Sequence, residues 1–175
     1  MRVLIINTSE RTGGAAVAAQ RLCEALNNNG VKAKMMVRDK ETDDITVVGT
    51  KNGWRAKAGF LWERWCVYCH LHFSRKHLWE IDIANAGTDI TKTREFREAD
   101  VIHLSWINQG MLSLKTIRKI LRSKKAVVWT MHDLWPATAI CHYARGCERF
   151  KSRCSNCPLL PGKGSKHDLA AKTWQ

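Results

Sequence analysis

The apolar positions of this chain alternate between short continuous runs and longer segments of helical spacing, and this alternation predicts an α/β fold. Runs typical of buried strands lie at Met1–Asn7, Val31–Val37, Ile45–Val48, Asp100–Leu104 and Lys125–Met131. Between them, Ala15–Asn28 and Gly110–Arg122 repeat apolar residues every three or four positions, as amphipathic helices do. Because βαβ units build parallel sheets, we expect a Rossmann-like, doubly wound, mostly parallel sheet.

A further apolar segment, Trp54–Phe73, predicts a helix whose apolar face is broad and rich in tryptophan. We favour a helix that packs in the protein interior. An interfacial membrane helix is the alternative, because it shows the same mixture of aromatic and basic residues. Within this segment, Cys66-x-x-Cys69 is interpreted as core packing rather than as a metal or redox pair. Ile81–Ala84 is a candidate edge strand.

Beyond Pro136 the regular pattern stops and a cysteine-rich loop begins. Further on, Ser165-x-x-Asp168 resembles a capping box, so we expect a helix to open there. That helix would have few residues before the sequence ends, which suggests truncation. We therefore expect a Rossmann-like domain over residues 1–140, a cysteine-rich loop within it over 141–161, and the start of a truncated helix over 162–175.

Chain length, composition and net charge limit the kinds of protein that this chain can be. A chain of 175 residues with 45% hydrophobic residues is long enough for one domain with its own core. Its longest apolar runs are much shorter than a membrane span or a signal-peptide core, so we expect a cytoplasmic protein. The formal net charge of +13 should attract polyanions, anionic lipid headgroups or phosphorylated small molecules, or it serves only as a solvated surface.

Polar and glycine residues gather where three of the predicted strands end. Gly13 and Gly14 stand between the first strand and its helix, where backbone amides and the helix dipole can attract an anion. His103 and His132 end or follow the later strands, and Asp133 adjoins the second histidine. Imidazole at such a position can hydrogen-bond a hydroxyl or phosphate oxygen, or exchange a proton. In an open α/β sheet these strand ends share one ligand-binding crevice, so we expect a single site.

Four of the seven cysteines lie close together, as Cys141-x5-Cys147-x6-Cys154-x2-Cys157. Only the last pair has the usual zinc-knuckle spacing, yet four thiolates within one loop can close a tetrahedral site. A structural zinc ion is the leading interpretation. Disulfides, or reduced thiols that only pack, are the alternatives.

Three stretches, together with the cysteine loop, resemble a known family. They are M-R-V-L-I-I-N-T-S-E-R-T-G-G-A-A at the start, A-D-V-I-H-L-S-W-I-N-Q-G at 99–110 and V-V-W-T-M-H-D-L-W-P-A-T at 127–138. They are similar to the N-terminal domain of bacterial family 4 glycosyltransferases of the two-domain GT-B type, which build exopolysaccharide or lipopolysaccharide. The run C-H-Y-A-R-G-C-E-R-F-K-S-R-C-S-N-C-P-L-L-P resembles the same subgroup.

The resemblance implies an acceptor-side domain in an enzyme that moves a sugar from a nucleotide sugar to a saccharide or lipid-linked acceptor. It implies catalytic roles for His103, His132 and Asp133, and no cofactor for catalysis. The implied substrate-binding residues are Gly13, Gly14, Ser105, Trp106 and Asn108. One departure stands out: Ser105 occupies the place of the second histidine in the family's H-x-H-W motif.

The resemblance also implies a partner that this sequence lacks, the C-terminal donor domain with its E-x7-E motif. Without that domain we expect the fragment to be inactive, because the donor domain would supply the electrostatic stabilisation of the departing nucleotide. Retention of anomeric configuration is implied by the family alone. Lipid-linked acceptors would bring the protein to the inner face of the plasma membrane, with Trp54–Phe73 as the contact.

Two other functions compete with the transferase. A basic, metal-stabilised nucleic-acid-binding module would use the cysteine loop and the positive surface. The loop has no recognition helix between ligand pairs and the aromatic residues lie elsewhere, so nucleic acid is disfavoured as a partner. A non-catalytic scaffold built on a transferase-like half is the other alternative, to which Ser105 points.

Overall fold

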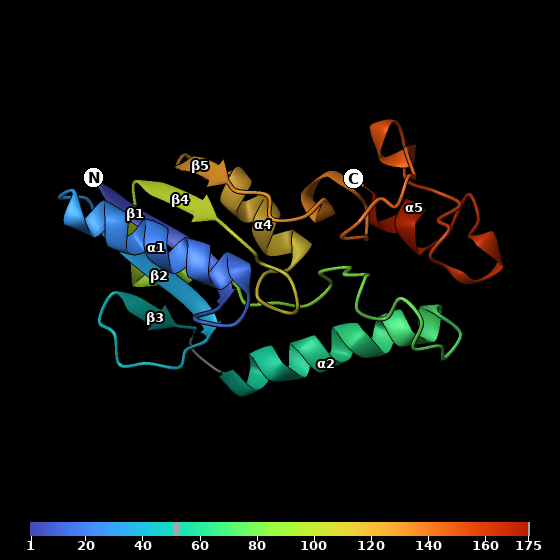
Figure 1. Cartoon of the computed structure of the whole chain (residues 1–175), viewed down its shortest axis with the longest axis horizontal. Helices are drawn as coiled ribbons and strands as arrows, with labels where there is room; N and C mark the ends of the chain where they lie inside the picture. Colours follow the sequence, from blue (N-terminus) through green and yellow to red (C-terminus); the bar gives the residue numbers. More distant parts are fainter. Residues whose placement is uncertain (51–52, 175) are drawn as a thin grey trace. The chain divides into compact units, whose positions relative to one another are not determined.

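The computed structural model describes residues 1–50 and 53–174. It contains a sheet of five parallel strands in the order β3-β2-β1-β4-β5 (Figure 1). The strands are β1 (Arg2–Ser9), β2 (Lys32–Asp39), β3 (Val47–Gly49), β4 (Val101–Leu104) and β5 (Ala126–Trp129). All five strands predicted for the sheet are present within a few residues of their expected bounds, and the parallel α/β fold class is confirmed.

The strand pairing places the N-terminal strand in the middle of the sheet. Ile5 of β1 lies opposite Met35 of β2 on one side and opposite His103 of β4 on the other. His103 in turn lies opposite Val128 of β5. Because the strands run in one direction, the residues that follow β1, β4 and β5 meet at the same edge of the sheet.

Helix α1 (Gly14–Asn28) packs on strands β1 and β2 and confirms the first predicted helix. Its buried residues include Ala19 and Cys23, which join the apolar side chains of Val3, Ile5, Ala33, Met35, Val37 and Val47. Asn27 fixes the end of the helix, because its side-chain amide donates to the Ala33 carbonyl and accepts from the Ala33 amide, both at 3.0 Å. The helix is therefore tied to the strand that follows it.

The helix between β4 and β5 is shorter than predicted. Helix α4 spans Leu114–Leu121, although the periodicity indicated a start at Gly110. Gln109 and Gly110 have φ of 55° and 79°, which excludes them from a right-handed helix. Ser113 instead caps α4 by accepting a hydrogen bond of 3.2 Å from the Thr116 amide. The first residues of the predicted helix thus form the loop that follows β4.

Two short helices precede β4 and were not predicted. They are η1 (Ile90–Lys92) and α3 (Arg94–Glu98). Asp89 caps η1 and Thr93 caps α3 through side-chain oxygens that accept from backbone amides. Helices of three and five residues are too short to produce a periodic apolar pattern, and their caps carry the only sequence signal.

Internal contacts divide the chain into two units. The first comprises Met1–Phe60 with Ala84–His132 and contains the sheet, whereas the second comprises Leu61–Ile83 with Asp133–Gln175. The boundaries predicted from sequence, at residues 140 and 161, both fall inside the second unit.

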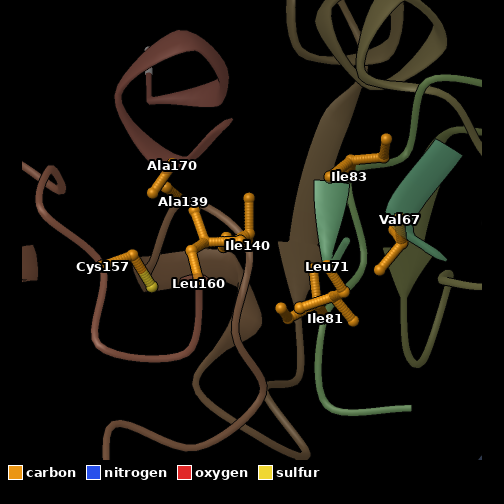
Figure 2. Packing of buried hydrophobic residues seen from close by; sticks show 9 residues of the cluster. All are labelled: Val67, Leu71, Ile81, Ile83, Ala139, Ile140, Cys157, Leu160 and Ala170. Carbon is orange, nitrogen blue, oxygen red and sulfur yellow. The ribbon is translucent and has the colours of Figure 1, made fainter. Parts of the chain in front are cut away.

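The second unit has little regular structure. It contains the later part of helix α2 (Gly53–His70), the short helices η2 (Trp135–Ala137), η3 (Arg149–Lys151) and η4 (Pro161–Lys163), and helix α5 (Leu169–Thr173). A small apolar cluster holds it together (Figure 2): Val67, Leu71, Ile81, Ile83, Ala139, Ile140, Cys157, Leu160 and Ala170. The predicted edge strand at Ile81–Ala84 is reduced to one antiparallel bridge, between Ile81 and Cys141.

Helix α2 does not bury the tryptophan-rich face that its sequence displays. Trp54, Trp62 and Trp65 are 69%, 58% and 53% exposed, so the preferred packing interpretation is wrong for these side chains. The buried face instead carries Glu63 and Arg64, whose charges are compensated by partners in the fold. Among the described residues, no helix is long and apolar enough to cross a membrane.

Helix α5 begins later than the proposed capping box. Asp168 is itself the N-cap, and its Oδ1 accepts a hydrogen bond of 2.9 Å from the Ala171 amide. Its Oδ2 accepts from the Cys157 amide at 2.7 Å and so connects the start of α5 to the cysteine loop. The Ser165 hydroxyl accepts from the His167 amide before the helix, so Ser165 does not cap α5.

Candidate functional site

Three of the predicted site segments lie at one edge of the sheet in the first unit. The loop before α1 follows β1, Ser105 follows β4, and His132 follows β5, and these three strands are adjacent. Figure 1 shows their carboxyl ends on the same side of the sheet as the start of α1. The fold therefore brings together residues that lie more than 90 positions apart in the sequence, as the strand pattern predicted.

The glycine pair stands at an open helix N-terminus. Gly13 has φ of 89° and precedes α1, while Gly14 is its first residue, and both are exposed. A Cβ at either position would meet nothing within 4 Å, so a ligand can approach the backbone closely. The first turn of α1 carries no acidic residue, which leaves its dipole free to attract an anion.

Glu10 anchors the loop that leads to these glycines. Its buried carboxylate accepts hydrogen bonds from the backbone amides of Glu41 (2.5 Å) and Thr42 (2.9 Å), and from the Thr42 hydroxyl. Burial alone would raise the pKa of Glu10, but these hydrogen bonds together lower it below its ordinary value. An ionised Glu10 thus holds the start of the loop against the segment after β2. Sequence analysis missed this residue, because a glutamate before a glycine pair has no distinctive signal.

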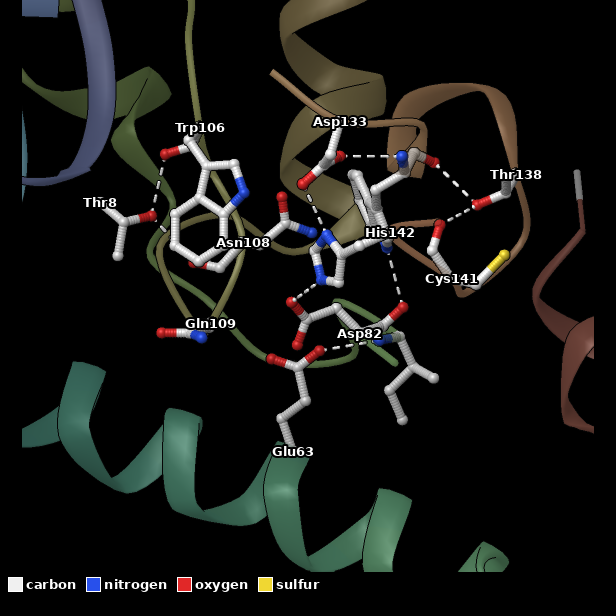
Figure 3. Close-up of polar contacts among 12 residues, drawn as sticks. Thr8, Glu63, Asp82, Trp106, Asn108, Gln109, Asp133, Thr138, Cys141 and His142 are labelled. Carbon is white, nitrogen blue, oxygen red and sulfur yellow. Dashed lines mark hydrogen bonds and ion pairs between the residues drawn. The ribbon is translucent and has the colours of Figure 1, made fainter. Parts of the chain in front are cut away.

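The segment after β4 is bound to the end of β1. The Trp106 amide donates to Asn7 Oδ1 at 3.0 Å, and the Thr8 hydroxyl lies 3.0 and 2.9 Å from the carbonyl oxygens of Trp106 and Asn108 (Figure 3). Asn108 is buried, and its side-chain nitrogen has no hydrogen-bond partner among the residues that the structure describes. The predicted substrate-binding residues Trp106 and Asn108 therefore belong to one rigidly held turn.

His103 is a buried residue of β4. It is 7% exposed, and its Nε2 lies 2.8 Å from the Thr130 hydroxyl. Its Nδ1 is buried, and no described residue hydrogen-bonds to it. Burial, and secondarily the charge of His132, lowers the pKa of His103 below its ordinary value, so the ring is neutral at pH 7. A neutral buried ring can position its neighbours but offers little surface to a ligand.

His132 is exposed and has a partner that sequence analysis did not anticipate. Its Nε2 lies 2.9 Å from Oγ of Ser105, which is only 4% exposed. Ser105 occupies the place at which the family pattern has a second histidine, so the departure from the pattern is the residue that contacts His132. The pair leaves His132 Nδ1 as the ring atom available to a ligand, as acceptor or donor according to the tautomer.

Asp133 belongs to a separate polar network in the second unit. Its Oδ1 accepts from the Trp135 amide at 2.9 Å and its Oδ2 lies 2.6 Å from His142 Nδ1. The other ring nitrogen of His142 lies 2.7 Å from Asp82, which also pairs with Arg64 (Figure 3). The sequence predicted a catalytic Asp133, whereas the structure engages both of its carboxylate oxygens within this network.

The network holds His142 in its charged form. Burial would lower the pKa of His142, but hydrogen bonds and charge interactions with Asp133 and Asp82 raise it to about 9. Both ring nitrogens donate to carboxylates, as only an imidazolium can. Sequence analysis missed this residue, because its partners lie 9 and 60 positions away.

The four clustered cysteines also lie in the second unit, and all are free thiols. They line one cavity of about 210 Å³. Burial raises the pKa of the Cys141, Cys154 and Cys157 thiols, in the last case to about 11. Within residues 1–50 and 53–174, no three His, Cys, Asp or Glu side chains already have a metal-binding arrangement.

Comparison with known proteins gives one relative. Over 66 residues the chain is 33% identical to "Putative colanic acid biosynthesis glycosyl transferase WcaC" of Escherichia coli (strain K12). The match covers 34% of this chain and 16% of that protein. The chain is thus related in sequence to a glycosyltransferase. No protein-family model and no solved structure matches it.

Proposed function

We propose that this chain is the acceptor-side, N-terminal part of a family 4-like GT-B glycosyltransferase in cell-surface polysaccharide synthesis. Such an enzyme moves a sugar from a nucleotide sugar to a saccharide or lipid-linked acceptor. The observation that carries the proposal is the shared sheet edge, where the open N-terminus of α1 and the Ser105–His132 pair follow adjacent strands. The 66-residue similarity to a colanic acid biosynthesis glycosyl transferase supports the same conclusion.

Each of the residues at this sheet edge would have its own role in binding an acceptor. The backbone at Gly13 and Gly14 would bind a phosphate oxygen, because an uncompensated helix N-terminus favours an anion. His132 would hydrogen-bond the acceptor hydroxyl and take up its proton, since a ring nitrogen of neutral imidazole can act as a general base. Ser105 would orient that ring, and Trp106 with Asn108 would shape the wall beside it.

His103 and Asp133 have supporting roles in this proposal. His103 is buried against Thr130, so it would fix the strand end beneath His132 without touching the acceptor. Asp133 would hold the backbone after His132, because its carboxylate is bonded to Trp135 and His142. Neither residue needs to exchange a proton during transfer.

A second domain is part of the proposal, because the family 4 resemblance includes a C-terminal donor domain, and the match covers only 16% of the relative. That domain would bind the nucleotide sugar and stabilise the departing diphosphate, and retention of anomeric configuration would follow from the family 4 resemblance. The isolated chain is then expected to bind acceptor but not to transfer sugar.

A membrane surface is the proposed location of the acceptor. The exposed Trp54, Trp62 and Trp65 of α2 support it, because tryptophan favours the headgroup region and the chain carries a net charge of +13. Sedimentation with anionic liposomes at low salt tests this part. Binding that is lost in the Trp62→Ser/Trp65→Ser double variant supports a role for this face, whereas equal binding of the variant contradicts it.

Acceptor binding tests the main proposal. We would titrate the chain with a water-soluble sugar pyrophosphate and follow the His132 ring and the Gly14 amide by NMR. Both signals should shift, and His132→Ala should weaken binding about tenfold, as expected when a hydrogen bond worth about 1.4 kcal/mol is lost. His167→Ala, at an exposed histidine of the second unit, is the matched control. Shifts confined to other residues, or preferential binding of duplex DNA, would contradict the proposal.

A further inference from the structure

Four cysteines that are spread over 17 positions of irregular chain converge on one cavity. Cys141 lies at the bridge to Ile81, Cys147 follows a turn at Gly146, and Cys154 and Cys157 flank Asn156. The cavity of about 210 Å³ is lined by all four cysteines.

The other residues that line this cavity exclude several kinds of ligand. Among the described residues, no aspartate or glutamate lines it, so it lacks the carboxylates that calcium and magnesium sites usually use. Its apolar lining includes Ile140, Phe150 and Leu159, and its charged residues are Arg145 and Arg149. Cysteine sulfurs, which bind metals as thiolates, form a site for a soft or borderline cation. Arg149 would partly neutralise the negative charge of such a complex, whereas Arg145 already pairs with Glu80 at 2.9 Å.

The backbone around the last pair is already fixed. The Cys157 amide donates to Asp168 Oδ2 at 2.7 Å, and the Asn156 amide donates to the Ser165 carbonyl at 2.9 Å. Gly164 packs so tightly here that a Cβ would come within 2.4 Å of the Cys157 nitrogen. A braced Cys-x-x-Cys turn presents two sulfur ligands at low entropic cost, as zinc knuckles do.

We propose that Cys141, Cys147, Cys154 and Cys157 bind one zinc ion that stabilises the second unit. Zn²⁺ replaces the four thiol protons, which pass to solvent, and forms a tetrahedral zinc–tetrathiolate site with a charge of −2. No three of these side chains have ligating geometry in the structure, so they must rotate inward to reach Zn–S distances of about 2.3 Å. The small apolar cluster and short helices of this unit explain why a metal crosslink is needed.

Metal content of the whole chain, purified under reducing conditions, tests the proposal. We expect about one zinc per chain, because a set of four cysteine ligands closes around a single ion. Replacing zinc by Co²⁺ should give the absorption bands of a tetrahedral cobalt–thiolate site, which an ion bound by histidine or carboxylate lacks. The absence of bound zinc, or a cobalt spectrum without thiolate bands, would overturn the proposal.

Thiol reactivity provides a second measurement that does not need a folded variant. In the native chain the four cysteines should react with a thiol reagent only after a chelator is added. Immediate reaction of all four, or a mass that reveals disulfides in the freshly prepared protein, contradicts the site. Cys154→Ser should abolish zinc binding, whereas Cys23→Ser, at a buried thiol that belongs to the core of the first unit, should retain it. These readouts are independent of sugar transfer, so they can fail while the proposed function stands.

Discussion

Ser105 Oγ lies 2.9 Å from His132 Nε2, and the two residues follow adjacent strands of the sheet. The contact gives the buried Ser105 hydroxyl a side-chain partner on the neighbouring strand end. Ser105 is buried and His132 is exposed, so the hydroxyl contacts the ring from its buried side. The other ring nitrogen is left for solvent or a ligand.

Removing that hydroxyl should alter the histidine without unfolding the protein. We expect Ser105→Ala to change the free energy of unfolding by about 1 kcal/mol, since an exposed imidazole can replace its lost partner with water. Binding of a sugar pyrophosphate should weaken by about fivefold, and the NMR chemical shifts of the His132 ring should change. Ser105→Thr keeps the hydroxyl and should retain binding. Unchanged ring chemical shifts of His132 and unchanged binding in Ser105→Ala would contradict a positioning role.

Alanine variants at Gly13 and Gly14 should differ in stability, because only Gly13 has a positive φ. Gly13→Ala should destabilise the chain by about 1 kcal/mol, because φ of 89° is unfavourable for any residue with a Cβ. Gly14→Ala should be neutral or slightly stabilising, since α1 begins there and the space around it is open. Chemical denaturation measures both changes.

A charge at the same position tests the anion site. Gly14→Asp should fold as well as Gly14→Ala yet bind inorganic pyrophosphate much more weakly, because its carboxylate occupies the positive end of α1. Calorimetric titration of the two variants measures the difference. Equal binding would show that pyrophosphate does not use this helix terminus.

The His142 network predicts how stability depends on pH. The pKa of His142 is raised from its ordinary 6.5 to about 9, so the folded state holds this proton more tightly than the unfolded chain does. Its contribution is fully present below pH 6.5 and is lost as the pH rises through about 9. Urea unfolding across this window should show falling stability, and His142→Gln should remove most of that slope. A slope that persists in the variant would assign it to other groups.

Because of Asp89, we expect stability to depend on pH in the opposite direction at acidic pH. Hydrogen bonding from Lys119 and Thr91 lowers its pKa from 3.8 to about 2, so its contribution is present above pH 3.8 and is lost as the pH falls toward 2. Both side chains are partly exposed, which keeps the expected effect of Asp89→Asn to about 1 kcal/mol at neutral pH. Acid unfolding of this variant, with the exposed Asp43→Asn as control, measures it.

Sequence patterns predicted the sheet because strands and long helices leave a local signature. Apolar runs located β1, β4 and β5, and the parallel arrangement that follows from βαβ units placed Gly13, Ser105 and His132 at one edge. Helix α4 was placed four residues too early, because apolar periodicity continued into a loop whose backbone has positive φ. The local pattern thus located the helices and strands, but it did not reveal the backbone conformations at which they begin or end.

The amino-acid sequence by itself determined the strands, their common direction and the gathering of candidate residues at their ends. Only the tertiary structure decided what those residues contact: Ser105 pairs with His132 across 27 positions, and His142 joins Asp82 across 60. It also exposed the tryptophans of α2 while burying Glu63 and Arg64. The physical reason is that apolar periodicity reflects local backbone geometry, whereas the burial of a charge depends on partners that only the folded chain brings within reach.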